Sequence, residues 1–220
     1  MSAYTTAADW LNLLSQLASG TLIALAVFAL TLVFSLPLGL GVAFGRMSKN
    51  PWIWRPVNFY ILVMRGTPLI LQLIFFYFII PRILPFRIER FPAAVIAFVL
   101  NYAAYFAEIY RGGIQSIPAG QYEAAQVLGY TRRQAFLRII LPQVVKRVLL
   151  PVSNEVITLV KDTALVSVLG ISELFRLARD ESSRAVSVVP LFAAGLVYFG
   201  LNAIVTKLFM WFEKKLDYYK

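Results

Sequence analysis

The chain has 220 residues, of which 60% are hydrophobic and 15% charged, and it contains no cysteine and no histidine. Disulfide scaffolds, thiolate metal sites, catalytic cysteine–histidine pairs and histidine general bases are therefore excluded. The net charge of +10 would indicate nucleic-acid binding in a soluble protein. Because so few residues are charged, it instead favours a membrane protein with basic cytoplasmic loops, and we expect no nucleic-acid partner and no metal site.

Five largely apolar stretches are long enough to cross a bilayer, which takes about 20 residues per helix. The expected spans are 20–45, 57–80, 91–111, 148–170 and 186–212. We therefore predict an all-α integral membrane protein with five transmembrane helices. Residues 1–19 would form an extracytoplasmic N-terminal segment, 20–212 the transmembrane domain and 213–220 a cytoplasmic tail.

Basic residues concentrate on one side of these spans, and cytoplasmic loops are enriched in Lys and Arg. They follow the first span, surround the long connection between the third and fourth spans, and end the chain: Arg46, Lys49, Arg55, Arg111, Arg132, Arg133, Arg138, Lys146, Arg147, Lys214, Lys215 and Lys220. This distribution predicts a multi-pass protein with its N-terminus outside and its C-terminus in the cytoplasm.

The second span carries Arg65 and Gln72 on one predicted helical face, with Thr67 and Pro68 between them. Thr followed by Pro is typical of an N-cap and a first helical residue. A helix interrupted here would point its positive N-terminus into the protein, as transporters do toward anionic substrate groups. A simple proline kink is the alternative interpretation.

Polar stripes follow the third and fourth spans. In the third span, Asn101, Tyr105 and Glu108 recur at helical spacing; in the fourth, an arc of about 120° holds Asn154, Glu155, Thr158, Lys161 and Asp162. Together with Arg65, Thr67 and Gln72, they predict a substrate pathway that holds the ammonium and carboxylate groups of an amino acid. The excess of carboxylates favours a basic or neutral substrate. Structural roles remain open, including an intrahelical Glu108–Arg111 pair and helix–helix contacts through Asn154 and Thr158.

The connection between the third and fourth spans, 112–146, is patterned as two helices around a glycine. Pro118 suits the first turn of a helix, and Gly129 is placed to end that helix in a left-handed conformation. Thr131 and Gln134 have capping-box spacing for a second helix, which we expect to end near Leu141. The unit could dock another protein or lie on anionic lipid, and both interpretations remain open.

The residues of this connection resemble the EAA motif of ABC importer permeases. The matching positions are Glu123, Ala124, Ala125, Gly129, Ile139, Leu141 and Pro142. Three further segments, 65–69, 107–114 and 159–165, look like the polar amino acid branch of that family. The resemblance covers nearly the whole chain and implies a type I importer permease with cytoplasmic coupling helices.

Several partners follow from this resemblance. No glycine of the chain is followed by lysine, so it holds no P-loop. ATP and Mg would therefore be bound by a separate ABC ATPase subunit, and the chain would be no enzyme. The resemblance also implies a second permease copy or a homologous permease, an extracytoplasmic amino-acid-binding protein, and residence among the lipids of a bacterial cytoplasmic (inner) membrane. A secondary transporter or channel driven by an ion gradient is the alternative function.

Overall fold

The computed structural model describes residues 4, 6–83 and 87–216, and all of its regular elements are helices. The first helix, α1, runs from Ala7 to Arg46 without interruption. It begins at a capping box in which Thr6 and Asp9 satisfy each other's backbone N–H groups. The helix thus starts inside the predicted N-terminal segment 1–19, of which residues 1–3 and 5 lie outside the described residues, as do residues 217–220 of the predicted tail.

The predicted second span, 57–80, is broken. The helix α2 (Pro51–Gly66) and the segment that starts with α3 (Leu69–Ile74) meet at an angle of 110°. Pro68 has no N–H and disfavours helical geometry in the residue before it, and Thr67 is indeed extended. Thr67 closes α2 while Pro68 is the N-cap of α3, one position away from the predicted assignment. The break is too sharp for a simple kink.

Two π-helical turns each end two residues before a proline. Phe75–Ile79 precedes Pro81 in α4 (Ile80–Ile83), and Phe136–Ile140 precedes Pro142 at the start of α8 (Leu141–Asp162). A wider turn accommodates a proline ring that would otherwise collide with the carbonyl four residues earlier. The second helix of the connection therefore does not end near Leu141. It runs from α7 (Arg132–Ala135) through the π turn into α8.

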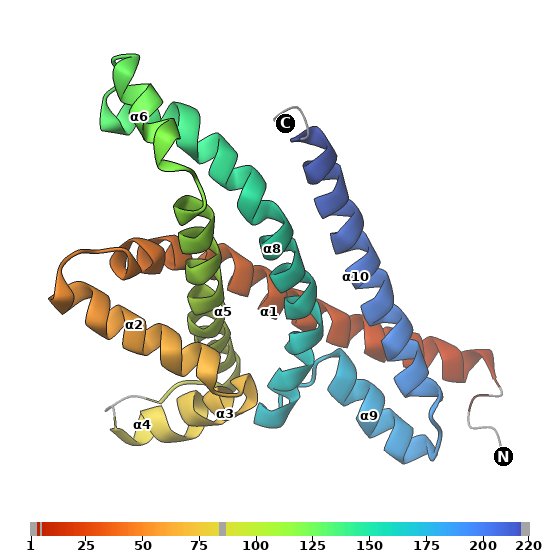
Figure 1. The fold of residues 1–220 in the computed structure, drawn as a ribbon. Coiled ribbons are helices and arrows are strands. Elements are labelled where there is room, and N and C mark those ends of the chain that lie inside the picture. Colours follow the sequence, from red (N-terminus) through yellow and green to blue (C-terminus); the bar gives the residue numbers. More distant parts are fainter. Residues whose placement is uncertain (1–3, 5, 84–86, 217–220) are drawn as a thin grey trace.

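The central helix is α5 (Arg90–Gln115), which packs against α1, α2, α3 and α8. Its aromatic side chains Phe98, Tyr102 and Phe106 are fully buried in the main hydrophobic core. The long helix α1 passes behind α5, α8 and α10 in the view of Figure 1. Gly39 permits this crossing, because a Cβ atom there would lie 2.9 Å from Cβ of Phe106.

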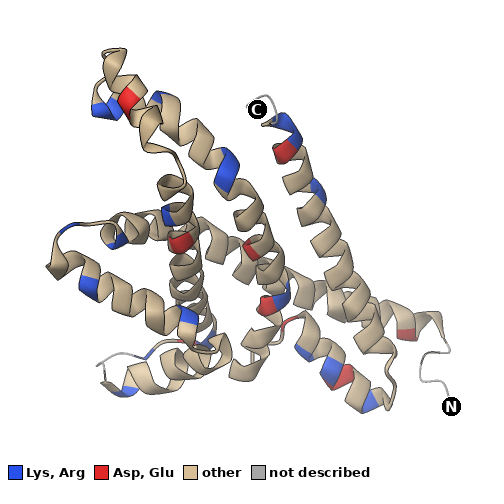
Figure 2. Ribbon diagram, in the orientation of Figure 1, with Lys and Arg blue, Asp and Glu red and all other residues tan. Residues whose placement is uncertain are grey.

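The remaining elements mark two ends of the molecule. At one end lie α6 (Ala119–Val127) and the last turns of α10 (Val189–Lys215); α9 (Leu174–Ala185), α3 and α4 lie at the other (Figure 1). A 3-10 segment, Thr163–Leu169, links α8 to the loop before α9. Figure 2 shows Lys and Arg positions at both ends, and acidic positions within α5 and α8.

Within the described ranges, α1, α5 and α10 are long and apolar enough to cross a membrane. The bent pair 51–66 and 69–83 passes the same test if it is counted as one span. The helix α8 is not among these candidates. Its charged residues are Lys146, Arg147, Glu155, Lys161 and Asp162, and this charge is the reason that its hydropathy falls short.

Candidate functional site

The break between α2 and α3 is held by buried amides. Pro68 leaves backbone carbonyls of α2 without helical partners, and Gln72 donates to the carbonyls of Met64 and Thr67 at 3.0 and 3.2 Å. Asn101, from α5, donates to Met64 O at 2.9 Å and to Gln72 Oε1 at 3.0 Å. Both amide side chains are buried. Thr67, Gln72 and Asn101 therefore stabilise the helix break, and they are not among the residues that line the groove described next.

A polar groove opens beside this break, between α2, α5 and α8. It consists of two adjoining cavities of about 400 and 470 Å³ that share Arg65, Tyr105 and Glu108. Arg46 at the end of α1 also lines the smaller cavity, and Arg147 and Glu155 of α8 line the larger one. Arg65 lies over the ring of Tyr105, with 5.2 Å from Cζ to the ring centroid. Arg65 and Gln72 do not share one face, because the helix break separates them.

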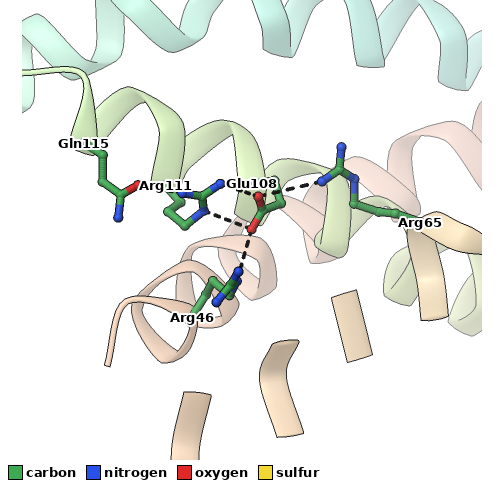
Figure 3. Close-up of polar contacts among 5 residues, drawn as sticks. All are labelled: Arg46, Arg65, Glu108, Arg111 and Gln115. Atoms are coloured by element: carbon green, nitrogen blue, oxygen red, sulfur yellow. Dashed lines mark hydrogen bonds and ion pairs between the residues drawn. The ribbon is translucent and has the colours of Figure 1, made fainter. Parts of the chain in front are cut away.

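Three arginines surround Glu108 in this groove (Figure 3). Arg111, one turn further along α5, donates two hydrogen bonds to its carboxylate at 2.6 and 3.0 Å, which confirms the predicted intrahelical pair. Arg46 and Arg65 approach from α1 and α2, at 3.6 and 3.8 Å from the carboxylate oxygens. Arg111 also donates to Gln115 at 2.6 Å. The surplus of carboxylates predicted for the pathway is therefore reversed around Glu108, where three cations face one anion.

The polar stripe of α8 is divided between two sides of the helix, because α5 packs on one side and α10 on the other. Glu155 faces the polar groove, whereas Asn154 lines a separate cavity of about 240 Å³ between α8 and α10. Glu155 has no hydrogen bond or salt bridge to any described residue. It is the acidic side chain of the groove that remains available to a cationic group.

The other predicted members of that stripe lie outside the groove. Thr158 is exposed and donates to the carbonyl of Asn154 at 2.9 Å. Lys161 is exposed near the end of α8, and Asp162 accepts a hydrogen bond of 2.8 Å from the buried Tyr102. Of the residues predicted for the pathway, Arg65, Tyr105, Glu108 and Glu155 line the polar groove. Sequence reasoning missed Arg46 and Arg147 as lining residues of the two cavities, and nothing in their local sequence places them at the groove.

The connection between α5 and α8 forms the predicted helix–glycine–helix unit. Gly129 has φ +77°, and Thr131 and Gln134 form the expected capping box. The helix α6 begins directly after Pro118, which serves as its N-cap. We call residues 116–142 the coupling segment.

The residues of the predicted motif are only partly at the surface of the coupling segment. Glu123, Ala124 and Gly129 are exposed, but Ala125 is buried against the second helix. Leu141 and Pro142 are half-buried, and Ile139 packs in the cluster around Ile117, Ile140 and Val144. At the tip, Val127 and Leu128 are 88% and 72% exposed. Sequence reasoning placed these two apolar residues within a helix and did not indicate that they would be exposed.

The opposite end of the molecule is organised by two buried carboxylates of the α9 region. Glu173 caps α9 by accepting from the backbone N–H groups of Phe175 and Arg176, both at 2.7 Å; burial raises the pKa of its carboxyl. Glu181 accepts from Arg184 at 2.6 Å and from Tyr4 at 3.1 Å. The hydrogen bond from Arg184 lowers the pKa of Glu181. Both carboxylates are engaged in holding α9.

Known proteins resemble this chain in sequence and in fold. Residues 35–218 match the family described as binding-protein-dependent transport system inner membrane component. The arginine transport system permease protein of Bacillus subtilis is 39% identical over 199 residues, 90% of each chain. The octopine transport system permease protein of Rhizobium radiobacter is 41% identical over 194 residues, which cover 82% of this chain and 79% of that protein. The crystal structure of an amino acid ABC transporter with histidines has a TM-score of 0.86 and 33% identity, covering 96% of this chain and 99% of that chain.

Proposed function

The chain belongs to the family of binding-protein-dependent transport system inner membrane components, as the permease subunit of an amino acid ABC importer, and we propose that it moves a basic or neutral polar amino acid. Its all-helical fold is that of type I ABC permeases. ATP hydrolysis belongs to a separate subunit, and the chain itself is not an enzyme. The proposed transport is by alternating access, in which the polar groove opens in turn to the two sides of the membrane.

The observation that carries the proposed substrate class is the unpaired carboxylate of Glu155 in the polar groove. The half-buried carboxylate of Glu155 forms no hydrogen bond or salt bridge to a described residue and interacts with Arg65 only at longer range, so a cation that joins it is favourable. The ammonium group of an amino acid, or a basic side chain, supplies that cation. Relatives named for arginine, octopine, glutamine and cystine transport agree with this class. An acidic side chain would instead approach Glu155 as a like charge.

The coupling segment provides the proposed contact with the ABC ATPase, which binds ATP and Mg. Its exposed residues, Glu123, Ala124 and Gly129, stand beside the apolar tip of Val127 and Leu128. Exposed apolar side chains at a protruding helix end favour a protein partner. Glu123 lies in the first turns of α6, where the helix dipole favours a carboxylate. Ile139, Leu141 and Pro142 hold the second helix against the first and so fix the shape of this surface.

The proposed topology places five spans in the cytoplasmic (inner) membrane of a bacterium. The polar helix α8 is the span that its own hydropathy does not reveal. Its Arg147 and Glu155 line the groove, whereas Lys161 and Asp162 lie at its other end. The N-terminus would lie outside and the C-terminus inside, with the coupling segment in the cytoplasm. A second permease, identical or homologous, would close the open side of the groove, and an extracytoplasmic amino-acid-binding protein would deliver the substrate near α9.

Uptake in cells tests this proposal. Labelled arginine, glutamine, cystine and glutamate are offered to cells that lack the chain and then regain it together with its ATPase and binding protein. We expect ATP-dependent uptake of at least one of the first three to be restored. Glu155→Gln should lower that uptake, whereas Glu213→Gln, which lines the separate cavity between α8 and α10, should leave it unchanged. Restoration of glutamate uptake alone would contradict the proposed substrate class, and uptake that persists after ATP depletion would contradict the mechanism.

A further inference from the structure

Two arginines meet at the end of the molecule that carries α3, α4 and α9 (Figure 1). Arg90 is the first residue of α5, and Arg176 lies in the first turn of α9. A Cβ atom at Gly170 would lie 3.0 Å from Nη1 of each arginine, so both guanidinium groups rest against the same glycine. Gly170 directly follows the 3-10 segment and has φ +79°, a conformation that favours glycine. This glycine makes room for two cations from separate helices.

The hydrogen-bond donors of this pair are only partly used. Nη1 of Arg176 is buried and has no hydrogen-bond partner within the described ranges. Asp180 lies 3.5 Å from Nε of Arg176 and 3.4 Å from Nη2 of Arg179, so two cations share its charge. Arg90 donates from Nε to the hydroxyl of Tyr77 at 3.4 Å and forms no salt bridge with any residue that the structure describes. Positive charge therefore exceeds negative charge around the pair.

The other carboxylates at this end do not neutralise the pair. Glu173 accepts hydrogen bonds from the backbone of α9 and from Tyr198, and Glu181 is bound to Arg184. Glu89 precedes α5 in sequence, but it forms no hydrogen bond or salt bridge with either arginine of the pair. The excess charge is thus a property of the site itself.

An oxyanion is the group that such a pair accommodates. A guanidinium has five N–H donors, no acceptor and a permanent charge. A buried donor without an acceptor is costly, and two neighbouring cations repel each other. A phosphate offers several acceptor oxygens to both guanidinium groups at once and relieves both costs through charge-assisted hydrogen bonds.

The surroundings of the pair indicate where this phosphate comes from. Tyr77, which contacts Arg90, belongs to the π turn Phe75–Ile79, and its neighbours Phe75 and Phe78 are exposed apolar side chains. Ile83, at the end of α4, is exposed as well. Exposed apolar side chains next to a tyrosine hydroxyl and arginines are typical of the membrane–water interface, where lipid headgroups lie.

We propose that Arg90 and Arg176 bind the phosphate oxyanion of an anionic phospholipid at the outer membrane surface. The phosphate bridges the start of α5 and the first turn of α9, beside the glycine turn that follows α8. This inference goes beyond the proposed function and uses the proposed topology only to assign the leaflet.

Lipid binding to the intact complex tests the inference. The permease–ATPase complex in detergent is titrated with phosphatidylglycerol and with phosphatidylcholine, and native mass spectrometry counts the bound lipids. We expect phosphatidylglycerol to bind about tenfold more tightly than phosphatidylcholine, whose choline cation offsets its phosphate charge. Arg90→Gln and Arg176→Gln should each lower the affinity for phosphatidylglycerol about tenfold or more, the usual effect of losing charged hydrogen-bond donors.

Matched variants separate this site from a general attraction and from misfolding. Arg82→Gln removes a cation of α4 at the same end but outside the pair, and it should change the affinity less than about twofold. Arg176→Lys keeps the charge and should retain part of the affinity that Arg176→Gln loses. Arg90 is exposed, so Arg90→Gln tests the site with little effect on the fold. The Tm of each variant without phosphatidylglycerol checks this directly.

Labelled inorganic phosphate, measured by equilibrium dialysis, distinguishes the two sources of the oxyanion. If it binds in an Arg176-dependent way while phosphatidylglycerol does not, the site takes free phosphate and the assignment to a lipid is wrong. Equal binding of the two lipids, or an equal loss in Arg82→Gln, would show that there is no specific site. If neither probe depends on the pair and the variants instead weaken binding of the extracytoplasmic amino-acid-binding protein, the pair recognises a protein carboxylate and the inference is overturned. ATP-dependent uptake in cells decides separately whether the proposed function stands.

Discussion

The coupling segment and the polar groove are built in opposite ways. The coupling segment is held by contacts between residues close in sequence, such as the capping box of Thr131 and Gln134. The groove brings together Arg46, Arg65 and Glu108 from three helices. A surface that is specified locally can be read from its residues, whereas a groove assembled from distant residues cannot.

The two regions also differ in burial. At the tip of the coupling segment the side chain of Val127 is 88% exposed, whereas Asn101, beside the groove, is 4% exposed. Substitutions in the coupling segment should therefore affect a partner more than folding. Substitutions in the groove walls should affect folding and transport together. Three experiments test this difference, from the largest expected effect to the smallest.

The largest effect is expected at Gly129. A side chain would meet no atom within 4 Å, but the φ of +77° is strained for any residue with a Cβ. Gly129→Val should displace α6 relative to the second helix at a cost of about 1–3 kcal/mol. We expect ATP-driven uptake to fall at least about tenfold, with the Tm of the isolated chain lowered by about 2–4 °C for each kcal/mol of this strain.

Gly120→Val is the matched control for that variant, because Gly120 also meets no atom within 4 Å and has no positive φ. It should retain uptake and binding of the ATPase, since valine costs little in a helix compared with glycine. Uptake that survives in both variants would refute the role of the left-handed turn. Loss in both would mean that any bulk on this face blocks docking.

An intermediate effect is expected at two adjacent glycines in the groove wall. A Cβ atom at Gly113 would lie 2.2 Å from Cγ1 of Val148, where α5 meets α8, whereas Gly112 faces open space. Gly113→Ala should lower the free energy of unfolding by about 1–3 kcal/mol, because β-branched Val148 adjusts poorly. Gly112→Ala should raise it by about 0.5–1 kcal/mol. Thermal unfolding of both purified variants measures the difference, and equal stabilities would show that the α5–α8 contact is looser than described.

The smallest effect concerns the local ion pair of α9, which resembles the coupling segment in being formed by residues close in sequence. Because Arg184 holds the pKa of Glu181 below its ordinary value, the ionised pair contributes stability above about pH 4.5 and loses it as the pH falls further. Glu181→Gln should therefore lower Tm by about 1–2 °C at pH 7 and by less at pH 3.5. Glu173 is unchanged in the wild type and in Glu181→Gln, so its own contribution to the pH dependence of Tm is the same in both and does not affect their difference. A Tm difference independent of pH would contradict this assignment.

Much of the coupling segment could be predicted from the sequence, because its signals are local. The left-handed Gly129 and the Thr131–Gln134 cap both follow from backbone chemistry within a few residues. The second helix was predicted too short, since a π turn lets it continue through Pro142. The burial of Ala125 and the exposure of Val127 depend on how α6 packs against the second helix of the segment. The local sequence does not specify this packing.

The sequence by itself determined an all-helical membrane protein of the ABC permease family, because apolar length and the spacing of a local motif are properties of the linear chain. Tertiary structure alone decided the charge of the groove. Stripes on single helices indicated an excess of carboxylates, but packing assigned Asp162 to Tyr102, Asn154 to another cavity and three arginines to Glu108. The reason is physical. The field at a side chain depends on every charge within several ångströms, and here those charges come from helices that are far apart in sequence.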